Sequence, residues 1–369
     1  MLSKIKTFLK KEPVLFVAAL CALVTVFFVL PDREYLHYID WRVLCLLFCL
    51  MAVVAGFQAV GFFRWLTELL LKHVRNGRVL SVALVLLPFF SAMAVTNDVA
   101  LLIFVPFTLS LLDDLGQKKA QIPTVVLQTV AANLGSMATP VGNPQNLFLY
   151  SAYDLGAGEF FAVTLPLTAV SLVALCLAAL PVLPKALPEQ QRQADASLHK
   201  GKLAAYAILF VLCLLTVLRI VPFVVTTAVI VAAFLLLDRK LLGKVDYMLL
   251  LTFVCFFVVS ENLGRIDAVR GFLQGLLGKN TLLTAVGASQ VISNVPAAVL
   301  LSPFTDRWQE LLAGVNIGGL GTPIASLASL ISLKLYMARP GANVGRFLLV
   351  FTAANLAGLA LLLAFTVLV

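Results

Sequence analysis

The chain has 369 residues, of which 61% are hydrophobic and only 12% are charged. These proportions exclude an ordinary soluble domain, in which about 25% of the residues are charged. The formal net charge of +9 comes from basic residues in short connections between apolar runs, which favours membrane topology over nucleic-acid binding. The apolar runs are long enough to cross a bilayer as helices and lack the alternation of a β-barrel, so we predict an all-α polytopic membrane protein.

The first elements in chain order are apolar runs that we interpret as membrane spans. The run at 14–30 follows four lysines and resembles a signal peptide, but no small-residue cleavage site follows it, so we predict a retained first span. Most of the 27 basic residues fall in connections on the side of the amino terminus, which predicts that this terminus is cytoplasmic. We predict nine full spans, at about 14–30, 41–63, 122–150, 160–183, 203–220, 221–237, 247–264, 311–337 and 347–369.

Two further apolar regions, 79–112 and 281–304, have a polar break near the middle and charged residues at both ends. We predict that each is a re-entrant helical hairpin, which enters and leaves the membrane on one side. Non-helical backbone is tolerated at membrane depth only where protein or a wet cavity covers it, so the tips should be buried in the protein. The predicted tip residues are Thr96, Asn97 and Asp98 in the first hairpin and Ser293 and Asn294 in the second.

Two of the predicted spans, 122–150 and 311–337, contain Gly, Pro and Asn residues that a continuous lipid-facing helix would not carry. We predict that both are broken helices whose polar groups line a binding site. Close packing of helices through small residues is the alternative, and we expect it for Ser326 and Ser329. The candidate residues are Asn133, Gly135, Ser136, Thr139 and Asn143 in the first break and Asn316, Gly318, Gly319 and Thr322 in the second.

The polar segments recur in the same order in two halves of the chain, which is the best sequence indicator of a transporter binding site. We predict a first repeat at 1–183, a cytoplasmic linker with a connecting span at 184–220, and a second repeat at 221–369. Four full spans in the first repeat and one in the connection give the second repeat the opposite orientation. The predicted architecture is therefore a pair of inverted repeats.

The candidate residues fall into two sets. At the first tip, free helix carbonyls and side-chain oxygens could bind a small cation, although Asp98 could instead simply cap the returning helix. The coupling-ion set is Thr96, Asn97, Asp98, Asn143 and Glu261. The substrate-binding set is Asn97, Asn133, Gly135, Ser136, Thr139, Ser293, Asn294, Asn316, Gly318, Gly319 and Thr322.

Glu261 lies late in the predicted span 247–264. An ionisable group inside a membrane is a functional candidate by default. Because Glu261 is near the outer end of its span, solvation or an ion pair with Arg265 is the alternative interpretation.

Enzyme motifs are missing from the sequence. There is no P-loop, and the three His and six Cys residues form no cluster or zinc spacing. We therefore expect neither an enzyme nor a metal site, and no cofactor other than a coupling Na⁺ or H⁺.

Four stretches, 96–106, 132–150, 289–296 and 314–336, resemble the ion transporter superfamily. The similarity is greatest to its citrate-transporter-like or anion-permease-like bacterial inner-membrane members, which are related to dicarboxylate/sodium symporters and arsenite permeases. The resemblance implies a secondary transporter of the inner membrane, a homodimer with a scaffold part and a moving transport part.

In the dicarboxylate members each hairpin tip reads Ser-Asn-Thr, whereas here the tips read Thr96-Asn97-Asp98 and Ser293-Asn294-Val295. The Asn-Asp form resembles the citrate and arsenite branches. We therefore expect transport of a small anion, citrate or another carboxylate, coupled to Na⁺ or H⁺. Sodium/proton antiport through Asp98 and arsenite or oxyanion efflux are the alternatives, and a membrane scaffold without transport would leave the duplicated breaks unexplained.

Overall fold

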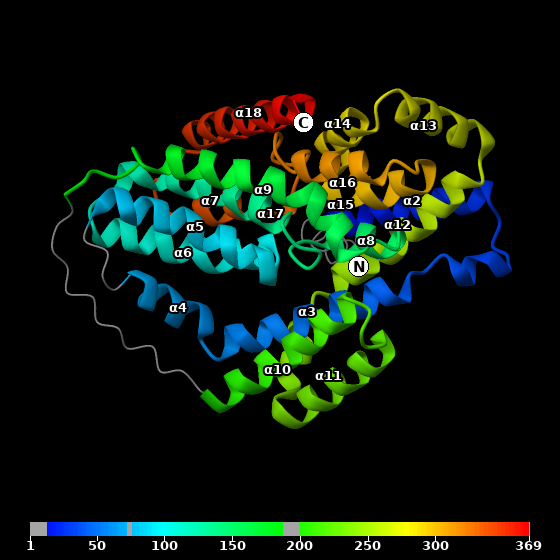
Figure 1. Ribbon diagram of the computed structural model, residues 1–369, viewed down its shortest axis with the longest axis horizontal. Coiled ribbons are helices and arrows are strands. Elements are labelled where there is room, and N and C mark those ends of the chain that lie inside the picture. Colours follow the sequence, from blue (N-terminus) through cyan, green and yellow to red (C-terminus); the bar gives the residue numbers. More distant parts are fainter. Residues whose placement is uncertain (1–12, 72–75, 187–199, 369) are drawn as a thin grey trace.

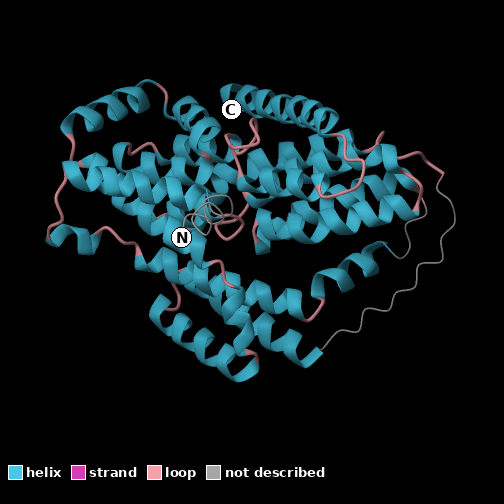
Figure 2. Ribbon diagram, turned by 180° about the vertical axis from the view of Figure 1, so that it is seen from behind, coloured by secondary structure: helices cyan, strands magenta, loops and turns pink. Residues whose placement is uncertain are grey.

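The structure is a computed structural model that describes residues 13–71, 76–186 and 200–368. The described residues form many helices joined by short loops, and none of them forms a strand (Figure 2). This result confirms the predicted all-helical polytopic fold. The basic residues at the amino terminus and most of the predicted linker after residue 183 lie outside the described residues.

Seven helices correspond to the seven predicted uninterrupted spans, and an eighth apolar helix, α5, forms one arm of the first predicted hairpin. Five of these eight helices are long and apolar enough on their own to cross a membrane. They are α3 (Trp41–Ala59), α5 (Gly77–Val95), α9 (Ala157–Ala179), α12 (Tyr247–Gly264) and α18 (Val344–Leu368). Three predicted spans are shorter apolar helices: α2 (Pro13–Phe28), α10 (Lys200–Val217) and α11 (Phe223–Leu237).

Both predicted hairpins are present, and they turn in the same way. In the first, α5 passes into α6 (Asn97–Asp114) at Thr96, which has φ 72° and ψ 149°. In the second, α14 (Thr281–Ile292) passes into α15 (Asn294–Leu301) at Ser293, which has φ 73° and ψ 154°. This region of backbone space strongly favours glycine, so each turn stores about 1–3 kcal/mol of strain that the surrounding contacts must offset.

Both predicted broken helices are also present. The first consists of α7 (Gln121–Ser136) and α8 (Pro144–Ala152), and the second of α16 (Trp308–Ile317) and α17 (Leu327–Met337). Helix α8 restarts where the sequence favours it, because Pro144 occupies its first turn and the Asn143 side chain accepts a hydrogen bond from the Asn146 backbone N–H at 2.9 Å.

Two amphipathic helices were not predicted. The predicted span 41–63 ends at Ala59, and α4 (Phe62–Leu71) follows as a separate helix. Helix α13 (Asp267–Lys279) fills a connection expected to be a loop. Apolar residues at helical spacing, Val269, Phe272 and Leu276, were the available signal. Four short 3-10 helices complete the described elements: η1 (Arg33–His37), η2 (Lys118–Ala120), η3 (Arg239–Lys244) and η4 (Ser302–Phe304).

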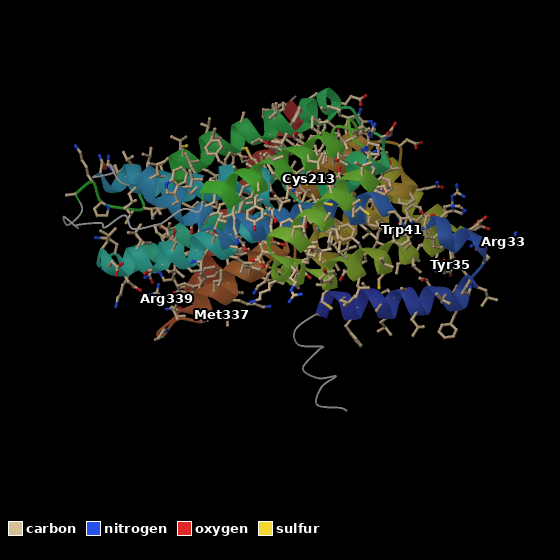
Figure 3. All side chains as sticks on the ribbon, turned by 90° about the horizontal axis from the view of Figure 1, so that it is seen from below. Arg33, Tyr35, Trp41, Cys213, Met337 and Arg339 are labelled. Carbon is tan, nitrogen blue, oxygen red and sulfur yellow. The ribbon has the colours of Figure 1, made fainter. Side chains whose placement is uncertain are left out.

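The helices form three packed groups around the breaks. Helix α7 packs against α5, α6, α9, α17 and α18, while α12 packs against α2 and α15, and α3 packs against α10 and α11. Figure 1 shows α3, α10 and α11 on one side of the molecule and the bundle around α7 on the other. Arg339 and Arg33 lie toward opposite ends of the long axis (Figure 3).

Candidate functional site

The structure brings the first hairpin tip and both helix breaks together around Asn133. Its side-chain carbonyl accepts hydrogen bonds from the Asn97 amide at 2.9 Å and from the Ser326 hydroxyl at 3.0 Å. Its side-chain amide donates to the Gly319 carbonyl at 3.4 Å. Asn97 and Asn133 are buried, so these bonds form in surroundings where an unmade hydrogen bond is costly. Ser326, which was expected to serve close packing, takes part in this polar cluster.

Asn316 joins the two breaks in a second cluster. Its side-chain carbonyl accepts from the Asn143 amide at 3.2 Å, and its amide donates to Asn146 Oδ1 at 2.7 Å and to the Leu312 carbonyl at 2.8 Å. The Asn143 amide also donates to the Ser136 hydroxyl at 3.1 Å. Asn316 therefore links the second broken helix to the start of α8, and Asn143 connects this point to Ser136 at the end of α7.

The second hairpin tip is held mainly through its backbone. The Asn294 backbone N–H donates to the Ala325 carbonyl at 2.9 Å, and the Ser293 hydroxyl donates to the same carbonyl at 3.3 Å. Gly319 lies beside this tip, because a Cβ added at Gly319 would be 2.9 Å from Asn294 Nδ2. Asn97 and Asn294 are thus connected through Asn133 and Gly319.

The two threonines of the breaks hold corresponding points of the two hairpins. The Thr139 hydroxyl donates to the Met93 carbonyl, three residues before the first tip. The Thr322 hydroxyl donates to the Gln290 carbonyl at 3.0 Å, three residues before the second tip. In each half, the same kind of bond therefore ties a hairpin to its broken helix.

Gln290 is a polar contact residue that the sequence analysis did not single out. Its side-chain amide donates to the carbonyls of Gly318 and Leu320, both at 2.9 Å, and its carbonyl accepts from the Thr322 backbone N–H at 2.9 Å. It thereby satisfies backbone groups that the second break leaves free. A lone amide in an apolar hairpin, three residues before a predicted tip, was the available signal.

The glycines of the breaks have different surroundings. A Cβ at Gly135 would be 2.0 Å from the Phe89 carbonyl oxygen, so this glycine allows α7 to contact the backbone of α5. A Cβ at Gly318 would be 2.8 Å from the Ser289 side chain. The structure therefore places Gly135 and Gly318 against neighbouring helices, and it places Gly319 beside the amides of the site.

Asp98 lies in the first turn of α6, next to the first tip. Its backbone N–H donates to Asn97 Oδ1 at 3.0 Å. Its Oδ1 atom is buried and has no hydrogen-bond partner among the described residues. The corresponding position in the second hairpin is Val295, so this carboxylate distinguishes the two tips.

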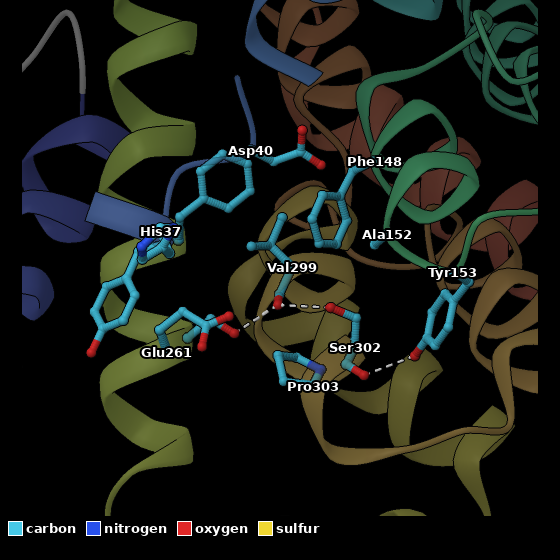
Figure 4. A pocket seen from close by; sticks show the side chains of 12 residues that line it. His37, Asp40, Phe148, Ala152, Tyr153, Glu261, Val299, Ser302 and Pro303 are labelled. Carbon is cyan, nitrogen blue, oxygen red and sulfur yellow. Dashed lines mark hydrogen bonds between the residues drawn. The ribbon is translucent and has the colours of Figure 1, made fainter. Parts of the chain in front are cut away.

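Glu261 lies apart from the asparagine clusters, in a cavity of about 440 Å³. The cavity is lined by α12, the connection from η1 to α3, the end of α8, and the end of the second hairpin, and Figure 4 shows this arrangement. Asn97, Asn133, Asn294 and Asn316 are not among its lining residues. The structure thus separates Glu261 from the other predicted coupling-ion residues.

The alternative ion pair between Glu261 and Arg265 is not formed. Arg265 instead contacts Asp32 at 2.6 Å and Glu34 at 3.5 Å, and it donates to the Tyr38 hydroxyl at 2.9 Å. The hydrogen bond from Arg265 lowers the pKa of Asp32 below its usual value, and it correspondingly raises the pKa of Arg265. These contacts fasten the connection before α3 to the end of α12.

Comparison with known proteins finds relatives that are described as transporters or as a membrane protein. The family model described as citrate transporter matches residues 8–308. An uncharacterized transporter of Methanocaldococcus jannaschii is 34% identical over 328 residues, which cover 87% of this chain and 88% of that protein. The inner membrane protein YbiR of Escherichia coli is 31% identical over 303 residues, 80% of each chain. A silicon efflux transporter of Oryza sativa is 32% identical over 127 residues, 34% of this chain and 26% of that protein.

Proposed function

The chain belongs to the citrate transporter family, and from this premise we propose that it is a secondary active transporter of a small anion, coupled to Na⁺ or H⁺. Citrate or another carboxylate is the proposed substrate. We further propose that the protein works as a homodimer in the inner membrane, with its amino terminus in the cytoplasm. Family membership and the apolar helices already make it a multi-pass membrane transport protein.

The observation that carries the proposal is the meeting of both hairpins and both broken helices at one set of buried amides. Asn133 contacts the first tip and the second break, while Asn316 contacts the first break from the other half. Each of these bonds can be exchanged for a bond to a substrate oxygen, because the donors are side-chain amide N–H groups. A set of amides contributed by both halves is suited to hold a small oxygen-rich substrate between them.

The helix ends around these amides support binding of an anion together with a cation. Four helices begin here, α6, α8, α15 and α17, and their free N–H groups favour a negative ligand. Four others end here, α5, α7, α14 and α16, and their free carbonyls favour a positive one. The hydrogen bonds of the clusters involve no Lys or Arg side chain among the described residues, so an anion would depend on the amides, the helix ends and a bound cation.

Asp98 is the proposed centre of coupling. A buried carboxylate oxygen without a partner is costly, and binding a proton or a cation removes that cost. Thr96, Asn97 and Asn143 are the other proposed oxygen ligands of the coupling ion. Glu261 is a second candidate, in a separate cavity.

Two alternatives rest on specific observations. The unpartnered oxygen of Asp98, present at one tip only, favours sodium/proton antiport with Asp98 as the titrating group. The partial similarity to a silicon efflux transporter, together with clusters that carry no basic side chain, favours efflux of a weakly charged oxyacid such as arsenite.

Uptake into liposomes that contain the purified protein tests the proposal. Asn97→Ala and Asn294→Ala should each reduce uptake of a carboxylate to near background under a Na⁺ or pH gradient. Asn262→Ala is the matched control, because Asn262 is buried in α12 and its amide donates to Thr25, away from both tips. Unchanged uptake by both tip variants would contradict the site.

The same liposomes distinguish the alternatives. Sodium-driven proton flux without any organic anion, abolished by Asp98→Asn, would establish antiport. Movement of arsenite or silicic acid without movement of carboxylates would establish oxyacid efflux.

A further inference from the structure

The cavity that contains Glu261 has a composition unlike that of the asparagine clusters. Carboxylates of Glu261 and Asp40 line it together with the rings of Tyr38, Phe148, Tyr153 and Phe257. His37 is the one His, Lys or Arg side chain among the described residues that line it. Its volume of about 440 Å³ lies within the usual range of small-molecule sites, about 300–1,000 Å³.

Glu261 is the lining group best placed to meet a ligand. Asp40 already accepts hydrogen bonds from the Val43 backbone N–H at 3.0 Å and from the Ser151 hydroxyl at 3.3 Å. The Glu261 side chain is exposed and makes no hydrogen bond or ion pair within the described parts of the chain, and Figure 4 shows it extending from α12 toward Val299. Both oxygens of the Glu261 carboxylate are therefore free to accept hydrogen bonds from a ligand.

The aromatic rings complete a site for positive charge. Phe148 of α8 and Phe257 of α12 are in contact, with ring centroids 5.8 Å apart and planes inclined by 38°. Ring faces attract an ammonium group, and a nearby carboxylate adds to that attraction. A metal ion fits less well, because no three His, Cys, Asp or Glu side chains converge in the part of the chain that the structure describes.

We propose that this cavity binds a small organic cation, an ammonium group joined to an apolar ring or chain, with Glu261 as the anionic anchor. Its apolar part lies against Phe148, Phe257 and Pro303. Asp40 contributes negative charge at longer range. A carboxylate ligand would be repelled by the same two acidic groups.

Because of the position of the cavity, a cation bound there should affect transport. This inference rests on the proposed function. Helix α8 carries Asn146 near its start and Phe148 and Ala152 at the cavity. Helix α15 begins at the second tip with Asn294 and reaches the cavity at Val299. A cation bound between these helices and α12 would hold them in one relative position, so it should inhibit transport without competing with the substrate.

Calorimetric titration of the purified full chain in detergent tests binding directly. Benzylammonium should bind, and benzyl alcohol and benzoate should bind at least about tenfold more weakly because they lack the positive charge. Glu261→Gln should weaken benzylammonium binding by about tenfold or more, while Phe257→Leu should weaken it by a smaller factor. Glu310→Gln, which removes an exposed carboxylate paired with Arg307 at 3.6 Å, should leave the affinity unchanged.

Equal affinity for benzylammonium and benzyl alcohol, or no binding of either, would overturn the proposal, as would equal effects of Glu261→Gln and Glu310→Gln. The transport step is read separately, as inhibition of liposome uptake by benzylammonium at the concentrations that saturate binding. Binding without inhibition would refute only the consequence for transport. Absence of uptake of every tested solute by the unmodified protein would refute the proposed function and leave the cation site standing.

Discussion

At the first hairpin tip the Asn97 side-chain amide donates to Asn133 Oδ1 at 2.9 Å, whereas at the second tip Asn294 donates from its backbone N–H to the Ala325 carbonyl at 2.9 Å. The first tip also carries Asp98, and the second carries Val295 at the same place. The side chain of Asn97 is therefore committed to the protein in this conformation, and the two tips offer different groups to a ligand.

The scaffold around the two tips is nevertheless duplicated. Thr96 and Ser293 have nearly the same dihedral angles, and Thr139 and Thr322 bind corresponding hairpin carbonyls. The residue before α8 donates to Asn316 just as the residue before α17 donates to Asn133. The two tips therefore share their backbone conformation and the hydrogen bonds that anchor it, whereas only the first tip carries an ionisable side chain, Asp98.

The largest expected effect is on packing of the shared frame. In Gly135→Ala the new Cβ would be 2.0 Å from the Phe89 carbonyl oxygen, a backbone atom that cannot move away easily. The counterpart Gly318→Ala places its Cβ 2.8 Å from the Gly314 carbonyl oxygen and from Ser289 Cβ and Oγ, which is a milder clash than that at Gly135. We expect Gly135→Ala to lower the free energy of unfolding by at least about 3 kcal/mol and Gly318→Ala by about 1–2 kcal/mol.

Thermal unfolding in detergent measures this difference. Gly287→Ala is the control, because Gly287 is helical and has open space around its Cβ position, so alanine should be neutral or slightly stabilising. If Gly318→Ala proved as damaging as Gly135→Ala, the two breaks would be packed more alike than the structure indicates.

Loss of the central amides should come next. Asn133 and Asn316 each make three hydrogen bonds through the side chain, so Asn133→Ala and Asn316→Ala should each lower the free energy of unfolding by about 2–3 kcal/mol. Asn262→Ala, which loses one bond to Thr25 at 3.2 Å, should cost about 1 kcal/mol. Chemical or thermal unfolding checks this order. A difference above about 2 kcal/mol between the two central variants would break the proposed equivalence of the halves.

Removal of the charge at the first tip should affect coupling more than stability. Asp98→Asn keeps the shape of the side chain and removes a buried carboxylate with an unpartnered oxygen, so the variant should be at least as stable as the parent without Na⁺. In this variant, the stimulation of uptake by a Na⁺ or H⁺ gradient should fall by a factor of about ten, which is equivalent to about 1.4 kcal/mol. Val295→Ala changes the counterpart without changing charge and should retain the stimulation. Normal ion dependence of uptake by the Asp98→Asn protein would show that coupling does not depend on this tip.

The backbone breaks could be predicted from sequence because their causes are local. Gly, Pro and Asn residues within apolar runs disfavour continuous helix wherever they lie, and the structure places breaks at all four predicted points. The opposite orientation of the two halves stays a prediction. Helix α13 was not predicted, although its apolar residues recur at helical spacing.

The partners of individual side chains could not be predicted in the same way. Ser326 was expected to serve packing, yet its hydroxyl donates to Asn133, nearly two hundred residues away in sequence. An ion pair between Glu261 and Arg265 was one alternative interpretation, because residues four apart share a helix face, but Asp32 binds Arg265 instead. Such contacts depend on which helices pack against each other, and local sequence patterns do not determine this.

The smallest expected effect concerns the bonds that tie each hairpin to its broken helix. Thr139→Val and Thr322→Val keep the shape of the side chain and leave one hairpin carbonyl without its hydroxyl donor. Thr139 is partly buried and Thr322 is exposed, so water can replace the lost donor more easily in the second half. We expect a loss of about 1–1.5 kcal/mol in unfolding free energy for Thr139→Val and about 0.5 kcal/mol for Thr322→Val. The double variant should show the sum of the two losses, because each bond anchors its own hairpin, and a loss well above that sum in thermal unfolding would show that the two halves are energetically coupled.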